Sequence, residues 1–210
     1  MKNGFTLIEL IISIFVMSVA VVGVYSAFSM VSVLTADTTD RLTATYLAQE
    51  GMEIVRNIRD TNWLNMDKER CFSGNDDPPC PVSWFDGLSS SSVSNSVDCS
   101  TSGCGADYKS VIMNPNFSDR NLCINSSGFY SYDLASSCTD TKFRRKIIIE
   151  SISDAKGNSD YIVKVTVQVS WNKKATILDL DGGVDASQCQ LSNCIKAEAT
   201  LYDWYNHNYH

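Results

Sequence analysis

Glu9 is a candidate functional residue, because it is a carboxylate inside a long apolar run near the beginning of the chain. From Leu7 to Leu34 the sequence has no other charged side chain and no proline. A run of this length can cross a bilayer, whose hydrocarbon core takes about 20 apolar residues. A carboxylate is costly in lipid unless it meets an opposite charge, so we expect Glu9 to have a functional role.

The alternative interpretation of this segment is a secretory signal peptide. Such a peptide has an apolar centre of roughly 7–15 residues followed by a cleavage site made of small residues. Here the apolar run is longer, and the small residue Gly4 comes before it. The segment therefore fits a membrane-spanning helix better than a signal peptide.

The residues GFTLIEL at positions 4–10, joined to this run, resemble the cleavage and methylation motif of type IV prepilins and pseudopilins. The resemblance implies that prepilin peptidase cuts between Gly4 and Phe5 on the cytoplasmic side and then methylates the new amino terminus at Phe5. It also implies that Glu9 pairs with the amino terminus of a neighbouring subunit during filament assembly, which would compensate its buried charge.

The chain has 8 cysteines, all beyond the apolar run, and an even number in an exported domain predicts disulfides. Many connectivities are possible, so pairing sequence neighbours is a guess. An alternative is a zinc site, since two of these pairs are close in sequence, although their spacing is loose for zinc ligands. The guessed pairs are Cys71–Cys80, Cys99–Cys104, Cys123–Cys138 and Cys189–Cys194.

An acidic segment in the last third of the chain is a candidate calcium site. Asp179, Asp181 and Asp185 surround two glycines, and carboxylate oxygens are the ligands that Ca²⁺ prefers. The pattern lacks the distal glutamate of an EF-hand loop. The alternative is an acidic turn between two strands.

Composition and motifs argue against nucleic-acid binding and against catalysis. The net charge of -7 disfavours contacts with phosphate backbones. The only basic cluster (Lys142, Arg144, Arg145 and Lys146) is split by strand alternation, with Arg145 on one face. No catalytic motif is present, so we expect a protein that is not an enzyme and carries no cofactor, although the acidic segment remains a candidate for calcium.

A long helix is expected to carry the amino-terminal motif. No proline occurs before Pro78, and an apolar stripe of helical period continues from Leu47 to Ile58, so we predict one helix from Phe5 to Arg59. Many major pilins interrupt this helix with glycine and proline, but Ser18 and Ser26 stand at the corresponding positions. Gly51 lies on the stripe and is either a site of close backbone approach to a sheet or a tolerated glycine.

Alternating apolar and polar residues in the last third of the chain predict an antiparallel sheet. The expected strands are residues 143–152, 161–171 and 195–205, with a hairpin turn at 154–159 and a short edge strand at 176–180. Residues 61–140 are loop-like, with short strands at 109–113 and 129–134. A long helix on such a sheet is an α+β arrangement and also the pilin fold.

These observations divide the chain into a leader (1–4), a transmembrane half-helix (5–34), an amphipathic half-helix (35–60), a loop-rich region (61–140) and a sheet (141–210). Lys2 before the run predicts a cytoplasmic amino terminus and an exported carboxyl end. The resemblance implies a minor pilin or pseudopilin that is inserted in the inner membrane and assembles with other pilins as a structural or priming subunit. Alternatives are an adhesive or ligand-binding tip subunit, a component of a type II secretion or DNA-uptake pseudopilus, and a membrane-anchored domain unrelated to filaments.

Overall fold

The computed structural model describes residues 6–66, 83–88, 98–132, 138–152, 162–172, 189 and 193–203. The chain divides into two compact units, Met1–Leu42 and Thr43–His210, and the long helix contributes to both. The elements in chain order are α1 (Leu7–Met66), the 3-10 helix η2 (Pro115–Phe117), and strands β1 (Asn121–Ile124), β2 (Tyr130–Ser131), β3 (Thr139–Ser151), β4 (Ile162–Trp171) and β5 (Cys194–Tyr202).

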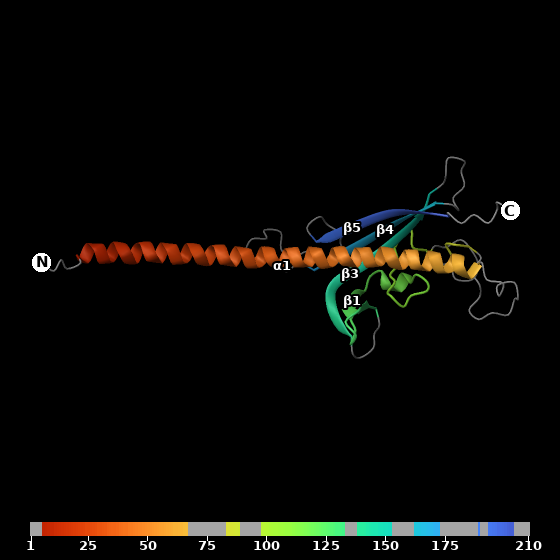
Figure 1. Ribbon diagram of the computed structural model, residues 1–210, viewed down its shortest axis with the longest axis horizontal. Helices are drawn as coiled ribbons and strands as arrows, with labels where there is room; N and C mark the ends of the chain where they lie inside the picture. The colour runs from red at the N-terminus through yellow and green to blue at the C-terminus, as the bar shows by residue number, and fades with distance from the viewer. Residues whose placement is uncertain are drawn as a thin grey trace. The chain divides into compact units, whose positions relative to one another are not determined.

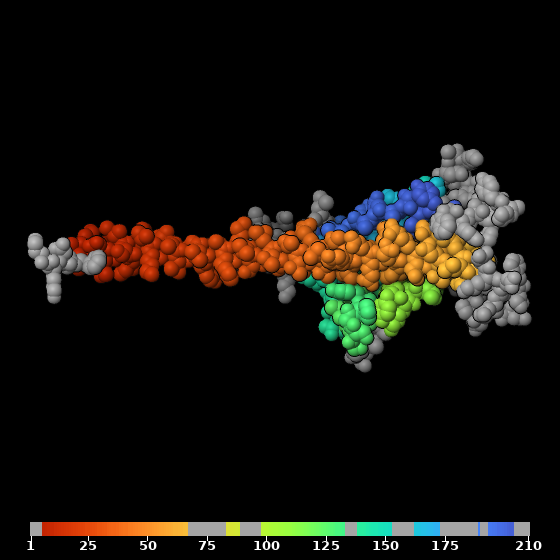
Figure 2. All heavy atoms as spheres, in the orientation of Figure 1, coloured from red at the N-terminus to blue at the C-terminus, as the bar shows by residue number. Residues whose placement is uncertain are grey.

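The first unit is built from the apolar part of α1. Large apolar side chains are exposed along it, from Leu7 at 76% to Leu34 at 55%. In Figure 2 the side chains of this part of the helix lie uncovered on the visible face. The helix is long and apolar enough to cross a membrane, and a helix that is apolar all round is stable where lipid or other helices surround it.

Several serine hydroxyls in this apolar part donate hydrogen bonds to the helix itself. The side chain of Ser18 donates to the carbonyl of Ile14 at 2.8 Å, and that of Ser29 donates to the carbonyl of Tyr25 at 3.0 Å. Such bonds to the preceding turn reduce the cost of placing a hydroxyl in lipid. The helix is continuous through Ser18 and Ser26, in line with the missing glycine and proline.

The second unit packs the rest of α1 on one antiparallel sheet of strand order β2-β1-β3-β4-β5. In Figure 1 this part of α1 runs across β3, β4 and β5. Strands β3 and β4 pair from Phe143↔Trp171 to Ser151↔Val163, and β4 and β5 pair from Ile162↔Tyr202 to Ser170↔Cys194. The arrangement is the α+β, pilin-like architecture expected from the sequence.

The core lies between α1 and the inner face of the sheet. The odd-numbered residues of β4 from Val163 to Trp171 are at most 2% exposed, which confirms the predicted alternation. On β3, Ile147 and Ile149 are fully buried, also as predicted. The outer face of β4 was expected to be exposed to solvent, but it is partly buried. Thr166 and Ser170 on this face are buried, since β4 lies between two neighbouring strands.

At Gly51 the helix lies so close to the sheet that a larger side chain would not fit. A Cβ atom there would lie 2.9 Å from Cδ of Arg145 and 2.9 Å from Cγ1 of Val167. Both neighbours are buried side chains of the sheet. Of the two interpretations of Gly51, the structure supports close approach.

Several predicted boundaries were wrong. Within the described residues the helix continues to Met66, beyond the predicted end at Arg59, because Asn62 and Trp63 continue its buried face. Residues 109–113 form the end of a turn, a bend and irregular backbone and not a strand. The strand expected at 129–134 is reduced to Tyr130–Ser131 within the described residues. The predicted hairpin at 154–159 and the edge strand at 176–180 lie outside the described residues.

Candidate functional site

The first turn of α1 presents Glu9 on an exposed surface. The carbonyl of Thr6 accepts hydrogen bonds from the backbone N–H groups of Glu9 at 3.1 Å and Leu10 at 3.3 Å, which starts the helix. The N–H groups of a first helical turn favour a negative charge, so the position suits a carboxylate. Gly4 and Phe5, the residues expected to flank the cleavage site, lie outside the described residues.

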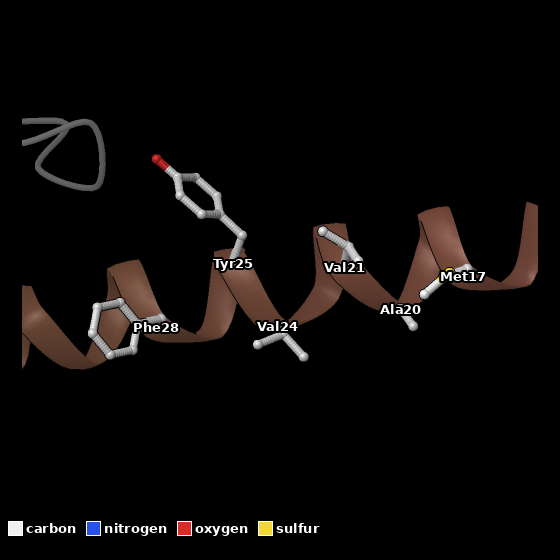
Figure 3. A pocket seen from close by; sticks show the side chains of 6 residues that line it. All are labelled: Met17, Ala20, Val21, Val24, Tyr25 and Phe28. Carbon is white, nitrogen blue, oxygen red and sulfur yellow. The ribbon is translucent and has the colours of Figure 1, made fainter. Parts of the chain in front are cut away.

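A shallow apolar hollow lies farther along this part of α1 (Figure 3). It offers only apolar contacts, and a Cβ added at Gly23 nearby in sequence would meet nothing within 4 Å. Such a surface suits lipid or another apolar helix. The six residues that line the hollow are Met17, Ala20, Val21, Val24, Tyr25 and Phe28.

In the second unit a buried arginine joins three parts of the chain. Arg145 on β3 is fully buried, and its Nη1 atom lies 3.3 Å from the carboxylate of Glu50 on α1. The guanidinium also donates to the carbonyls of Leu47, at 3.3 Å, and Ala106, at 2.6 Å. The hydroxyl of Tyr132 donates to the carbonyl of Arg145 at 2.8 Å. Arg145 therefore stabilises the contact of the helix with both the sheet and the preceding loop segment.

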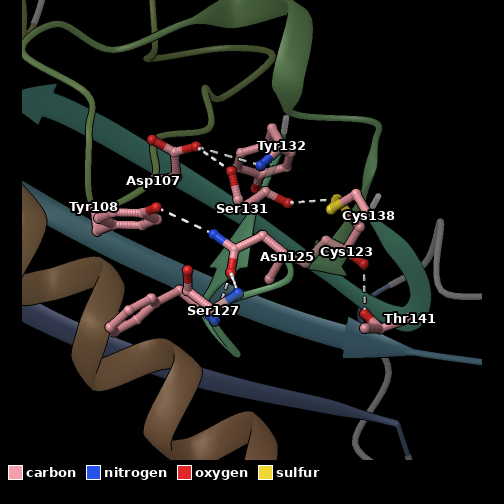
Figure 4. Close-up of a disulfide and its surroundings, with 11 residues drawn as sticks. Asp107, Tyr108, Cys123, Asn125, Ser127, Ser131, Tyr132, Cys138 and Thr141 are labelled. Carbon is pink, nitrogen blue, oxygen red and sulfur yellow. Dashed lines mark hydrogen bonds between the residues drawn. A yellow bond between two sulfur atoms is a disulfide. The ribbon is translucent and has the colours of Figure 1, made fainter. Parts of the chain in front are cut away.

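A buried carboxylate organises the loop segment itself. Asp107 accepts a hydrogen bond from the hydroxyl of Ser131 at 2.7 Å (Figure 4). It also accepts from the hydroxyl of Ser110 and from the backbone N–H of Lys109, each at 3.1 Å. Burial acts to raise the pKa of Asp107, but these bonds and one from the N–H of Tyr132 outweigh burial and lower it. The ionised carboxylate thus ties the 107–110 turn to β2.

Next to this carboxylate two exposed rings form a pair, the aromatic pair Tyr108 and Phe129. Their centroids lie 5.1 Å apart with an interplanar angle of 35°. The side-chain oxygen of Asn125 accepts from the N–H groups of Ser127 and Phe129, each at 3.0 Å, and its amide donates to the hydroxyl of Tyr108 at 3.1 Å. Asn125 therefore fixes the turn that carries Phe129 and holds Tyr108 against it.

Three disulfides are present among the described residues, and each joins neighbours in sequence. They are Cys99–Cys104, Cys123–Cys138 and Cys189–Cys194. The first is fully buried and pairs with β3, since the backbone groups of Cys104 and Ile147 exchange two hydrogen bonds of 2.8 Å. Sulfurs bonded to each other are not thiolates, so the structure favours disulfides over the zinc alternative for these cysteines.

Other candidate residues lie outside the described part of the chain. They are the remaining cysteines Cys71 and Cys80 and the calcium candidates Asp179, Asp181 and Asp185. The basic cluster is divided between the two faces of β3 as the sequence predicted, with Arg145 buried and its neighbours Arg144 and Lys146 half-buried. The cluster therefore does not form one basic surface.

The sequence interpretation missed the residues that organise the loop segment. Asp107 precedes Ser110 by three positions, and Asn125 precedes Gly128 by three positions. An Asp or Asn followed at this distance by Ser or Gly is a turn signature, because its side chain bonds the backbone two residues on. These two turns could have been predicted, but no local signature indicates that they pack together.

Comparison with known proteins connects the amino-terminal segment to a described motif. Residues 1–25 match the family model of the prokaryotic N-terminal methylation motif. No curated protein and no solved structure matches the chain. Together with the long apolar helix and the helix-on-sheet architecture, the motif is consistent with a type IV pilin-like protein. The motif and the apolar helix fit membrane insertion with the carboxyl-terminal domain outside.

Proposed function

We propose that the chain is a minor pilin or pseudopilin, a structural or priming subunit of a type IV pilus-like filament. The observation that carries the proposal is the methylation motif at residues 1–25, which is continuous with an exposed apolar helix. In this proposal residues 1–4 are the leader, prepilin peptidase cleaves after Gly4, and Phe5 becomes the methylated first residue. The pilin-like motif and fold indicate a structural subunit rather than an enzyme.

Assembly follows from the surface chemistry of α1. The spanning part, residues 5–34, buries its apolar side chains first in the inner membrane and then against the same part of other pilins. Glu9 lies on the exposed surface of the first turn, where it pairs with the amino terminus of a neighbouring subunit. A charge pair of this kind sets the register of one helix against the next, because an unpaired carboxylate is costly in an apolar surrounding.

The second unit is the exported domain. Its sheet packs on residues 43–66 of α1, and the loop segment is held by disulfides, by Asp107 and by Arg145. Disulfides of this kind persist in oxidising compartments, which supports a location outside the cytoplasm. This unit contributes the outer surface of a pilus, or of a pseudopilus in type II secretion or DNA uptake.

A second candidate function is an adhesive or ligand-binding subunit at the filament tip. It is favoured by the aromatic pair, whose members Tyr108 and Phe129 are 43% and 56% exposed although both are large rings. Locating the subunit along filaments separates a structural role in the shaft from the two roles at the tip, priming and adhesion. Labelling at the tip alone favours priming or adhesion, and labelling along the shaft favours a structural role.

Filament incorporation of a Glu9→Ala variant tests the proposal. We expect the variant to be cleaved and membrane-inserted but depleted from sheared filaments. Glu53→Ala is the matched control, because Glu53 is an exposed glutamate of the same helix in the second unit, with its side chain 66% exposed. Equal incorporation of both variants would contradict the assembly role of Glu9.

A further inference from the structure

The aromatic pair resembles a preformed recognition surface. Tyr108 and Phe129 lie on two different turns, and each turn is closed by the side chain that begins it, Asp107 or Asn125. Gly128 has a φ of 84°, which lets the second turn close. Asp107 also accepts a hydrogen bond from the hydroxyl of Ser131, which is fully buried, and this bond ties the first turn to β2, the strand that follows the second turn.

This network fixes the rings in position and leaves them partly exposed, with the Lys109 ammonium 5.5 Å from the centroid of the Tyr108 ring. Exposed aromatic side chains that are already ordered lose little entropy on binding, and for this reason they are common anchors in recognition surfaces. The hydroxyl of Tyr108 accepts the amide hydrogen of Asn125, so its own hydrogen remains to be donated to another group. The surface thus combines ring faces with an oriented hydroxyl donor.

We propose that the aromatic pair binds carbohydrate, with the C–H face of a β-linked pyranoside stacked on the rings of Tyr108 and Phe129. In a β-linked pyranoside the axial hydrogens of one ring face form a flat apolar surface, while the hydroxyl groups lie around its edge. The two rings supply the matching apolar surface. The Tyr108 hydroxyl donates to a sugar oxygen at the edge.

Charge and area distinguish this ligand from the other occupants of an aromatic surface. Single-stranded nucleic acid also stacks on aromatic rings, but the net charge of -7 opposes a polyanion. A stable protein interface buries about 800 Å² on each partner. Two aromatic side chains supply at most about 500 Å² when fully buried, and these two are already half-buried. A sugar ring matches a surface of this size.

Binding by the purified full-length chain tests the proposal independently of filament assembly. The probes are immobilised oligosaccharides that end in β-linked galactose, glucose or N-acetylglucosamine. The detergent is a polyoxyethylene ether, because alkyl maltosides carry a sugar that would compete. We expect saturable binding to at least one probe. The variants Tyr108→Leu and Phe129→Leu keep an apolar side chain but remove the ring face, and each should weaken binding by about tenfold.

The controls separate stacking from folding and from protein contacts. Tyr202→Leu changes an aromatic side chain on β5 that is 54% exposed and should leave binding unchanged. If Tyr108→Leu lowers stability, Tyr108→Phe removes only the hydroxyl and should still weaken binding several-fold. Absence of binding to all three probes, or binding that survives both leucine substitutions, overturns the proposal. Self-association that both leucine substitutions abolish would assign the surface to a second copy and overturn it as well.

Discussion

The buried ion pair between Glu50 and Arg145 gives a sharp prediction for the second unit. The substitution Glu50→Gln keeps the size of the side chain but removes its charge. An arginine side chain carries a positive charge, and that of Arg145 is fully buried. In the variant its charge would meet only neutral acceptors: the carbonyls of Leu47 and Ala106 and the amide oxygen of the new glutamine.

The expected loss of stability follows from the burial of the two partners. Removing one partner of a fully buried ion pair costs about 3–5 kcal/mol. The side chain of Glu50 is 35% exposed, so water already screens part of the pair, and we expect about 2 kcal/mol. For a chain of this size that corresponds to a fall in melting temperature of about 4–8 °C.

Urea unfolding of the full-length chain, followed by tryptophan fluorescence, measures this loss. Trp63, Trp84 and Trp171 are buried in the second unit, and residues 1–42 contain no tryptophan, so the signal reports the unit of interest. Glu53→Gln is the control, because Glu53 pairs with Arg56 on the surface of the same helix. We expect the control to change stability by less than about 0.5 kcal/mol.

A double variant tests the cause. Arg145→Met removes the charge that Glu50 compensates, so the Glu50→Gln and Arg145→Met substitutions together should destabilise by less than the sum of their separate effects. Additive effects, or a Glu50→Gln variant as stable as Glu53→Gln, would refute the account of Arg145 as a buried charge that depends on Glu50.

Three further predictions concern the second unit. The pKa of Asp107 is lowered in the fold from its ordinary 3.8. The ionised carboxylate therefore stabilises the fold above pH 3.8, and this stabilisation is lost as pH falls through the folded pKa. Urea midpoints should fall less from neutral to acidic pH in Asp107→Asn than in the native chain. Gly51→Ala should destabilise by about 1 kcal/mol in the same assay, since overpacking by about 2 kcal/mol exceeds a helix gain of about 1 kcal/mol; a more stable variant would contradict the close approach to Arg145. Replacing Cys123 and Cys138 by alanine opens a loop with a sequence separation of 15 and should lower the free energy of unfolding by about 3 kcal/mol. An unchanged urea midpoint would contradict a stabilising role of this disulfide.

The regular elements could be predicted because their periodicity is local. Alternation from Val163 to Trp171 fixes which side of β4 is buried, and the absence of proline and the apolar stripe on α1 predict a continuous helix. The end of α1 could not be predicted, because Asn62 is polar. It belongs to the buried face only because its amide donates to the carbonyls of Trp84 and Asp86, 22 and 24 residues farther along the chain.

In the candidate site, too, local motifs could be predicted from the sequence and contacts between distant residues could not. Seven consecutive residues carry the processing motif, so the sequence alone indicated Gly4, Phe5 and Glu9. The buried carboxylate Asp107 and the aromatic pair could not be found in this way. Their geometry depends on hydrogen bonds between turns that lie far apart in sequence, such as the bond from Ser131 to Asp107 with a separation of 24 residues.

The intact mass of the full-length protein, purified from a host with a prepilin peptidase, tests the central claim most directly. We expect a chain that lacks Met1 to Gly4 and carries one methyl group on Phe5. A chain that retains its first four residues in such a host would contradict processing as a prepilin, and with it the proposed assembly through Glu9.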